Sequence, residues 1–171
     1  MADQNTPVLM PAASPLFLRE AEIRRGVELL YFGHGHLTRT IDDELAVQGL
    51  GRAHHRALYF IARQPGLTVS DLLKLLAITK QSLGRVINDL IARDLITSQS
   101  GSVDRRQKLL QLTQAGHRLE VRLFEGLREK LGGAYARAGQ HAVTGFWQVL
   151  EGLIPADEIG RVMALQGKNV R

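Results

Sequence analysis

The chain has 171 residues, of which 44% are hydrophobic and 23% charged, and its formal net charge is +5. This composition is typical of a globular protein with a core of its own, and the absence of cysteine excludes disulfides, thiolate metal ligands and cysteine redox sensing. No apolar run approaches the roughly 18–20 residues that cross a bilayer, and the N-terminus lacks the pattern of a secretory signal, so we expect a cytoplasmic protein.

The N-terminal third predicts an arm followed by helices. Residues 1–15 carry three prolines among small and polar residues, which indicates a flexible arm. Over residues 16–47 apolar side chains recur at helical spacing, so we expect one long helix, with Gly33 and Gly35 as its candidate break points. A second helix is expected over residues 52–63, because Pro65-Gly66 stops it.

The middle of the chain predicts a helix-turn-helix. Thr68 begins a short helix with Asp71 three residues later, which resembles a capping box. A turn at residues 77–78 leads to Thr79, a good N-cap for a helix that runs to about Asp94.

A helical wheel at about 100° per residue separates two faces of this second helix. One face is aliphatic and holds Leu83, Val86, Ile87, Leu90 and Ile91. The opposite face is polar and holds Gln81, Arg85, Asn88 and Ala92. Most polar helix faces are merely solvated, so the wheel alone leaves open whether this face binds anything.

The remainder predicts a hairpin and further helices. Residues 95–98 and 107–112 indicate two short strands around a turn and a basic triplet, so we expect a β-hairpin wing. Thr113 begins a helix that Gly132-Gly133 interrupts, and a last amphipathic helix ends at Pro155. The apolar helices at both ends of the chain need a partner, and a homodimer interface built from both ends is the economical answer.

The predicted fold class is therefore mainly α with a small β-hairpin wing, a winged helix-turn-helix core flanked by dimerisation helices. The predicted organisation is an arm at 1–15, a dimerisation helix at 16–47, a winged helix-turn-helix lobe at 48–112, C-terminal dimerisation helices at 113–156 and a tail at 157–171.

The expected partner is duplex DNA. Residues 48–112 hold ten Lys and Arg against four Asp, so the positive charge is concentrated in the lobe. The major groove admits one helix, where Gln pairs with adenine and Arg with guanine. The candidate residues of the reading helix are Thr79, Lys80, Gln81, Ser82, Arg85 and Asn88.

An arginine at the tip of a hairpin suits the narrow, electronegative minor groove, and a neighbouring Asp can hold it in position. The candidate wing residues are Asp104, Arg105, Arg106 and Lys108.

The stretch from Leu67 to Gly116 resembles the winged-helix core of the MarR family. The resemblance rests on the helix after the Pro-Gly turn, the helix from Thr79 to Asp94, the Asp-Arg-Arg triplet and the Leu-Thr-Gln-Ala-Gly exit at residues 112–116. It implies homodimers that bind pseudo-palindromic DNA, usually as repressors, and a wing pair formed by Asp104 and Arg106. The sequence departs from the family pattern at Gly84 and at Asp94, which replaces a common glycine.

The sequence says less about the signal that such a regulator senses than about its binding to DNA. The resemblance implies no cofactor and a small aromatic or lipophilic acid as effector. Four histidines suggest a metal-responsive variant instead, but His34 and His36 point about 200° apart on a helix, and the adjacent His54 and His55 also diverge. Surface or core-packed histidines are the favoured interpretation.

Two other classes of function compete with DNA binding. A winged-helix module that docks proteins without binding DNA would carry a weakly basic reading face and a blunted wing. An enzyme would carry a recognisable catalytic or phosphate-binding motif, and the sequence has no Gly-rich phosphate loop, HExxH or GxSxG motif. We expect no enzymatic activity.

Overall fold

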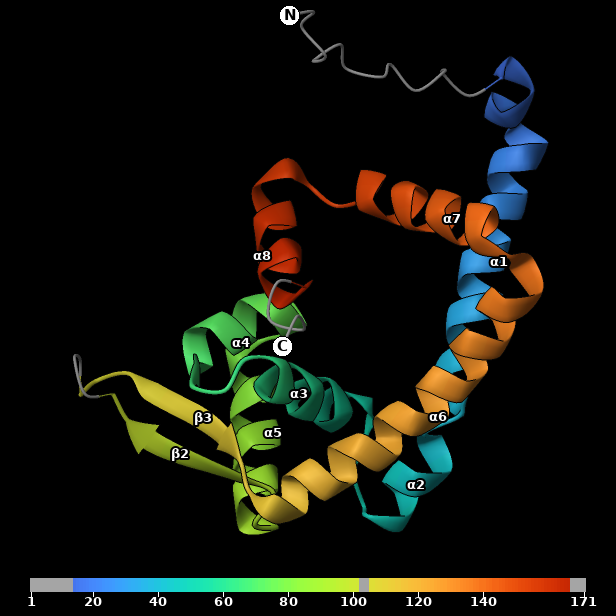
Figure 1. Cartoon of the computed structure of the whole chain (residues 1–171). Helices are drawn as coiled ribbons and strands as arrows, with labels where there is room; N and C mark the ends of the chain where they lie inside the picture. Colours follow the sequence, from blue (N-terminus) through green and yellow to red (C-terminus); the bar gives the residue numbers. More distant parts are fainter. Residues whose placement is uncertain (1–13, 102–104, 167–171) are drawn as a thin grey trace, which may run out of the picture. The chain divides into compact units, whose positions relative to one another are not determined.

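The computed structural model describes residues 14–101 and 105–166. The chain divides into two compact units, Met1–His36 and Leu37–Arg171. The helices are η1 (Pro15–Leu18, a 3-10 helix), α1 (Glu20–Arg39), α2 (Asp42–Val47), α3 (Arg52–Arg63), α4 (Val69–Leu76), α5 (Lys80–Ala92), α6 (Gln114–Ala138), α7 (Gln140–Gly152) and α8 (Ala156–Gln166). The strands are β1 (Leu67–Thr68), β2 (Ile96–Ser100) and β3 (Lys108–Leu112) (Figure 1).

The predicted single helix over residues 16–47 is wrong in one respect, because the chain breaks between α1 and α2. Gly33 and Gly35 lie inside α1, and the break falls at Thr40, whose hydroxyl donates to the carbonyl of Leu37 at 2.6 Å. The next residue, Ile41, is 2% exposed and belongs to the core. Burial of this side chain, together with Leu45, redirects the chain where sequence periodicity indicated continuity.

The core of the second unit lies among α2, α3, α4, α5, the start of α6 and the sheet. Its largest fully buried side chains are Ile41, Leu45, Leu58, Ile61, Leu72, Leu76, Leu83, Leu90, Ile96, Leu110, Leu119 and Leu123. The predicted aliphatic face of α5 is buried with one exception, since Ile91 is 41% exposed. Burying each such side chain contributes about 1.5–3 kcal/mol to folding.

The hairpin wing is confirmed, and it belongs to a three-stranded antiparallel sheet in the order β1-β3-β2. Ile96 pairs with Leu112 at the base of the hairpin and Ser100 with Lys108 near its tip. The hairpin extends away from the helices of the lobe (Figure 1). Strand β1 was not predicted, because two residues are too few to carry a sequence periodicity.

The predicted N-caps are confirmed. Thr79 Oγ1 accepts from the amide of Ser82 at 3.1 Å, and Thr113 Oγ1 accepts from the amide of Gly116 at 3.0 Å. Thr68 Oγ1 accepts from the amide of Asp71 at 3.0 Å and donates to its carboxylate at 2.7 Å. Such caps fix where each helix begins, and each contributes about 1 kcal/mol.

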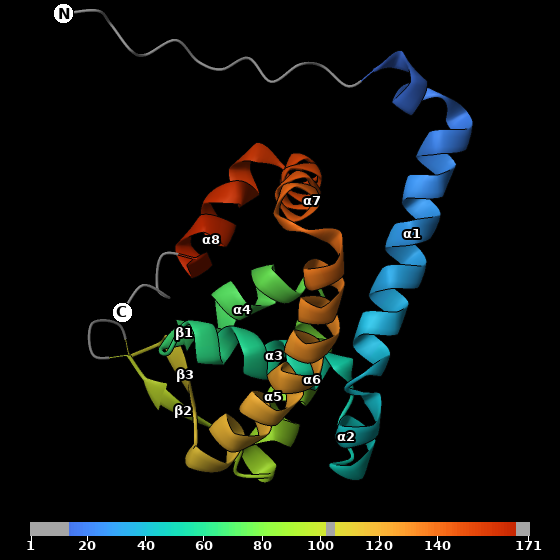
Figure 2. The ribbon, with the colours of Figure 1, turned by 45° about the vertical axis from the view of Figure 1, so that its right-hand side comes forward.

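The C-terminal helices differ from the prediction at two places. Gly132 and Gly133 do not interrupt α6, which continues to Ala138 and ends at Gly139 with φ +79°. The segment expected to be a tail contains α8, which lies beside α4 in both views (Figures 1 and 2). Arg63 in α3 donates to the carbonyl of Leu165 in the last turn of α8. This long-range contact has no signature in local sequence.

Candidate nucleic-acid interface

The polar face of α5 is exposed, as the wheel predicted. Lys80, Gln81, Ser82, Arg85 and Asn88 are all exposed, while the aliphatic residues of the opposite face, Leu83, Val86, Ile87 and Leu90, are buried. The Thr79 hydroxyl donates to Ser82 Oγ at 2.9 Å, which leaves the Ser82 hydroxyl proton for another acceptor. Thr79 therefore organises the first turn, where amide groups and the helix dipole favour an anion.

Two contacts fix α5 against the rest of the lobe. Arg93, the C-cap residue, donates to the carbonyl oxygens of Gln48 and Gly49 at 2.7 and 3.3 Å. His54 Nε2 lies 3.3 Å from Asp89 Oδ2. Neither contact was predicted, because both join residues more than 30 positions apart. Together they tie the C-terminal half of α5 to α3 and to the segment that follows α2.

The wing presents its cations on an exposed hairpin. Arg105, Arg106 and Lys108 are exposed, and Lys108 Nζ reaches Ser100 Oγ across the hairpin at 3.4 Å. The predicted partner of Arg106, Asp104, lies outside the described residues. The described cations of the hairpin thus lie at its end away from the pair Ile96 and Leu112.

Several arginines of the lobe form hydrogen bonds within the protein, although their side chains stay exposed. Arg56 donates to the carbonyl of Leu76 at 2.8 Å, at the C-terminus of α4. Arg52 forms an ion pair with Asp42 at 2.7 Å, and this hydrogen bond holds the pKa of Asp42 below its usual range. Of the ten basic residues in 48–112, Arg52, Arg56, Arg63 and Arg93 thus have structural roles.

The start of α6 is packed against the end of the helix-turn-helix more tightly than the sequence indicates. A Cβ built on Gly116 lies 1.9 Å from the carbonyl oxygen of Leu95. Thr113 donates to this oxygen from its amide at 3.1 Å, and its hydroxyl donates to the carbonyl of Asp94 at 2.6 Å. The sequence feature that marks this junction is the Leu-Thr-Gln-Ala-Gly segment at residues 112–116, whose glycine allows α6 to lie close to the carbonyl of Leu95.

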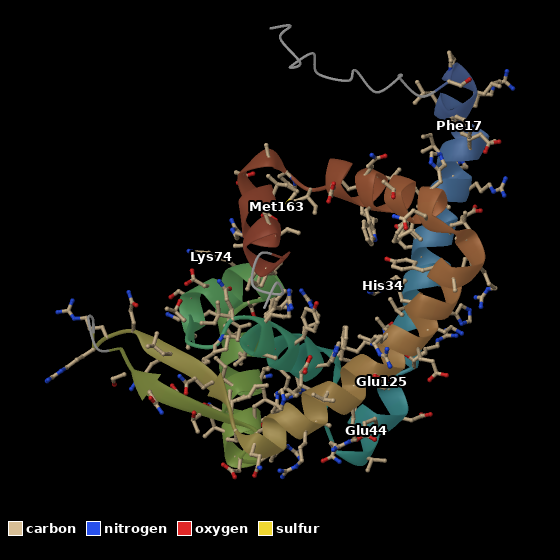
Figure 3. The ribbon with its side chains drawn as sticks, viewed as in Figure 1. Phe17, His34, Glu44, Lys74, Glu125 and Met163 are labelled. Carbon is tan, nitrogen blue, oxygen red and sulfur yellow. The ribbon has the colours of Figure 1, made fainter. Side chains whose placement is uncertain are left out.

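A cavity of about 400 Å³ lies between α3 and α6. It is lined by Leu37, His55, Tyr59, Phe124, Leu127, Arg128, Leu131, Gly132 and Tyr135. Burial, followed by the charge of Arg56, lowers the pKa of His55, which favours a neutral imidazole at the wall. Arg128 is paired with Glu125, which Figure 3 labels on α6. The cavity is thus apolar and aromatic, with a cation at its rim.

The histidines do not gather into a metal site in the part of the chain that the structure describes, where no group of three His, Cys, Asp or Glu could hold an ion. His34 and His36 lie on α1, and Figure 3 labels His34 there. His54 Nδ1 accepts from the amide of Gly51 at 3.1 Å, at the start of α3, and His55 is buried. Within residues 14–101 and 105–166, no helix has both the length and the apolarity to cross a bilayer.

An exposed reading helix capped by threonine, next to a basic hairpin, defines a winged-helix protein of the DNA-binding class. A sequence model described as "MarR family" matches residues 48–107. The HTH-type transcriptional regulator PetP of Rhodobacter capsulatus is 43% identical over 154 residues, which cover 90% of this chain and 91% of that protein. The chain therefore belongs to the MarR family of transcriptional regulators, which are not enzymes.

Solved structures agree with this fold. A MarR-family regulator from Silicibacter pomeroyi superposes with a TM-score of 0.66 at 18% identity, covering 82% of this chain and 94% of its own. A mutant MarR from E. coli, complexed with operator DNA, gives a TM-score of 0.64 at 19% identity, covering 83% and 100%. PcaV from Streptomyces coelicolor, in complex with its natural ligand, gives 0.61 at 21% identity, covering 87% and 100%.

Proposed function

We propose that this regulator is a homodimer that binds a pseudo-palindromic site in duplex DNA and acts as a repressor. Helix α5 enters the major groove, where Gln81 and Arg85 read base edges while Lys80 and Ser82 bind phosphates. The observation that carries the proposal is the exposure of these polar side chains on a helix whose other face is buried. The E. coli relative complexed with operator DNA supports the choice of partner.

The wing supplies a second contact in this proposal. Arg106 enters the minor groove, while Arg105 and Lys108 bind the flanking phosphates. A hairpin that extends from the lobe with three exposed cations supports this assignment. A winged-helix module that docks proteins instead is disfavoured, because its wing would have no use for this density of positive charge.

The dimer forms through the helices at both ends of the chain. In the N-terminal unit large apolar side chains of η1 and α1 are exposed, including Phe17, Tyr31 and Phe32. In α7, Trp147 and Val149 are 49% and 63% exposed. Apolar faces of this extent need a partner in water, and a second copy satisfies both ends. A chain that sediments as a monomer at all concentrations would refute the dimer.

The cavity between α3 and α6 is the proposed effector site. Its aromatic walls and the cation at its rim suit a small aromatic or lipophilic acid, and its volume lies within the range of small-molecule sites. The PcaV structure with its natural ligand supports a ligand-responsive regulator. Binding of the acid lowers the affinity for DNA in this proposal, and a screen of such acids for release of bound DNA tests it.

The decisive experiment is selection of a binding site from a random DNA pool, followed by titration of variants. We expect Arg85→Ala to lose about 1–3 kcal/mol of binding free energy on the selected site and to relax sequence preference. Binding to a scrambled duplex of the same composition is the control, since it depends mainly on phosphate contacts. If affinity and preference both survive the substitution, α5 is not the reading helix.

A further inference from the structure

The recognition helix carries a carboxylate close to its proposed reading arginine. Asp89 is the one acidic residue in α5, and it follows Arg85 by four positions. Residues with this spacing lie one turn apart on the same side of a helix, where Arg and Asp form ion pairs. Such a pair would draw the Arg85 guanidinium along the helix surface and away from a base edge.

The structure directs the Asp89 carboxylate elsewhere. Its Oδ2 lies 3.3 Å from His54 Nε2, in the first turn of α3. The other ring nitrogen, Nδ1, accepts from the amide of Gly51 at 3.1 Å. Because Nδ1 is an acceptor, the proton of the neutral ring is on Nε2, and this N–H donates to Asp89. The ring is therefore committed at both nitrogens.

Burial shows which partner positions the other. The His54 side chain is 16% exposed and held by the backbone of its own helix, whereas the Asp89 side chain is 59% exposed. Other groups near these two elements are already engaged, since Arg93 binds the carbonyls of Gln48 and Gly49, and Arg52 binds Asp42. The imidazole, which is held at both nitrogens, thus determines where the exposed carboxylate lies.

We propose that His54 is a positioning residue for DNA recognition, which holds the Asp89 carboxylate on the α3 side of α5 and so leaves Arg85 to reach the base edge. This inference rests on the proposed role of α5. Without the imidazole, Asp89 either pairs with Arg85 or presents an unpaired negative charge to DNA. An exposed pair at this spacing changes an equilibrium about twofold, and like-charge repulsion at the interface adds to that.

The test is a double-mutant cycle with His54→Ala and Asp89→Ala. Binding is measured by fluorescence anisotropy on a duplex selected by the wild-type protein from a random pool, and on a scrambled duplex of equal composition. We expect His54→Ala to weaken binding to the selected duplex by about two- to tenfold, with a smaller change on the scrambled one. Asp89→Ala binds at least as tightly as the wild type.

The double variant distinguishes positioning from a structural role. Both His54→Ala and the double variant lack the cap on Gly51, so a loss caused by a weaker α3 persists in both. We expect the double variant to recover the affinity of Asp89→Ala, because the competing carboxylate is gone. A double variant that stays as weak as His54→Ala, or a His54→Ala that binds like the wild type, overturns the inference.

Two further variants keep the result interpretable. If His54→Ala does not fold, His54→Glu replaces it, because Glu at this position is a preferred capping-box acceptor and repels Asp89. Its loss of affinity is expected to be partly reversed by Asp89→Ala, and no reversal counts against the inference. Arg85→Ala is the reference. If Arg85→Ala leaves specific binding unchanged, the proposed reading role of α5 fails. If Arg85→Ala weakens specific binding but Asp89→Ala does not restore the affinity lost by the His54 variant, only the role of His54 is rejected.

Discussion

Replacement of Gly116 by alanine tests whether the junction between the helix-turn-helix and α6 is as close as the structure indicates. The added Cβ would lie 1.9 Å from the carbonyl oxygen of Leu95 and 2.9 Å from its carbonyl carbon. Both are backbone atoms, so no side chain can move aside, and the first turn of α6 must retreat. The retreat strains the hydrogen bonds from Thr113 to Leu95 and from Thr113 to Asp94.

The expected cost follows from these contacts. Overpacking destabilises the protein by about 1–3 kcal/mol, and each of the two strained hydrogen bonds by about 1 kcal/mol. The higher helix propensity of alanine stabilises it by about 1 kcal/mol. We therefore expect Gly116→Ala to lower the free energy of unfolding by about 2–4 kcal/mol, measured as a lower urea midpoint with an unchanged slope at fixed protein concentration.

Gly84→Ala is the matched control for this substitution. Gly84 is exposed in the interior of α5, and a Cβ built there meets nothing within 4 Å. The same chemical change should stabilise the protein by about 0.5–1 kcal/mol. If the two variants shift the midpoint in the same direction, or if Gly116→Ala is as stable as the wild type, the close approach is wrong.

Three further predictions concern the wing, a strained turn and the cavity. Arg106→Ala should weaken DNA binding and reduce the slope of log affinity against log salt by about one, and an unchanged slope and affinity would exclude a wing contact. Ala77→Gly should raise the melting temperature, because Ala77 ends α4 in the left-handed conformation, with φ +50°. Glycine relieves this strain, and the relief exceeds the extra entropy of glycine in the unfolded state by about 0.5–1 kcal/mol. A lower melting temperature would contradict the prediction. Burial lowers the folded-state pKa of His55 below 6.5, so the unfolded chain takes up the proton first and stability falls as the pH drops through that value. His55→Gln should flatten this fall, as urea titrations at several pH values would show, and an unaltered pH profile would refute the assignment.

The fold followed from the sequence where local signals are strong. Threonines at 68, 79 and 113 precede apolar runs, and all three cap helices in the structure. The polar face of α5 was predicted correctly because four aliphatic residues at helical spacing are buried opposite it. A departure from the family pattern was also informative, since Asp94 adopts φ +53°, the conformation that a glycine there would suit.

Errors arose where a distant contact decides the outcome. Gly132-Gly133 looked like a helix break, but Tyr135 and Trp147 join α6 to α7 through a 2.9 Å hydrogen bond and ring packing, and α6 continues to Ala138. Helix α8 packs beside α4, where Figure 3 shows Met163 and Lys74 on the two neighbouring helices. The bridge from His54 to Asp89 spans 35 residues, so no local pattern announces it.

The arginines bound to backbone carbonyls limit how this lobe can be re-engineered. Arg56 donates to the carbonyls of Leu75 and Leu76 at the end of α4. Arg93 donates from two different nitrogens to the carbonyls of Gln48 and Gly49, which a lysine, with a single nitrogen, cannot reproduce in the same directions. A variant made more acidic to reduce non-specific adhesion should therefore keep these arginines. Counting arginines in the primary structure overstates how many positive charges can be exchanged without loosening the scaffold.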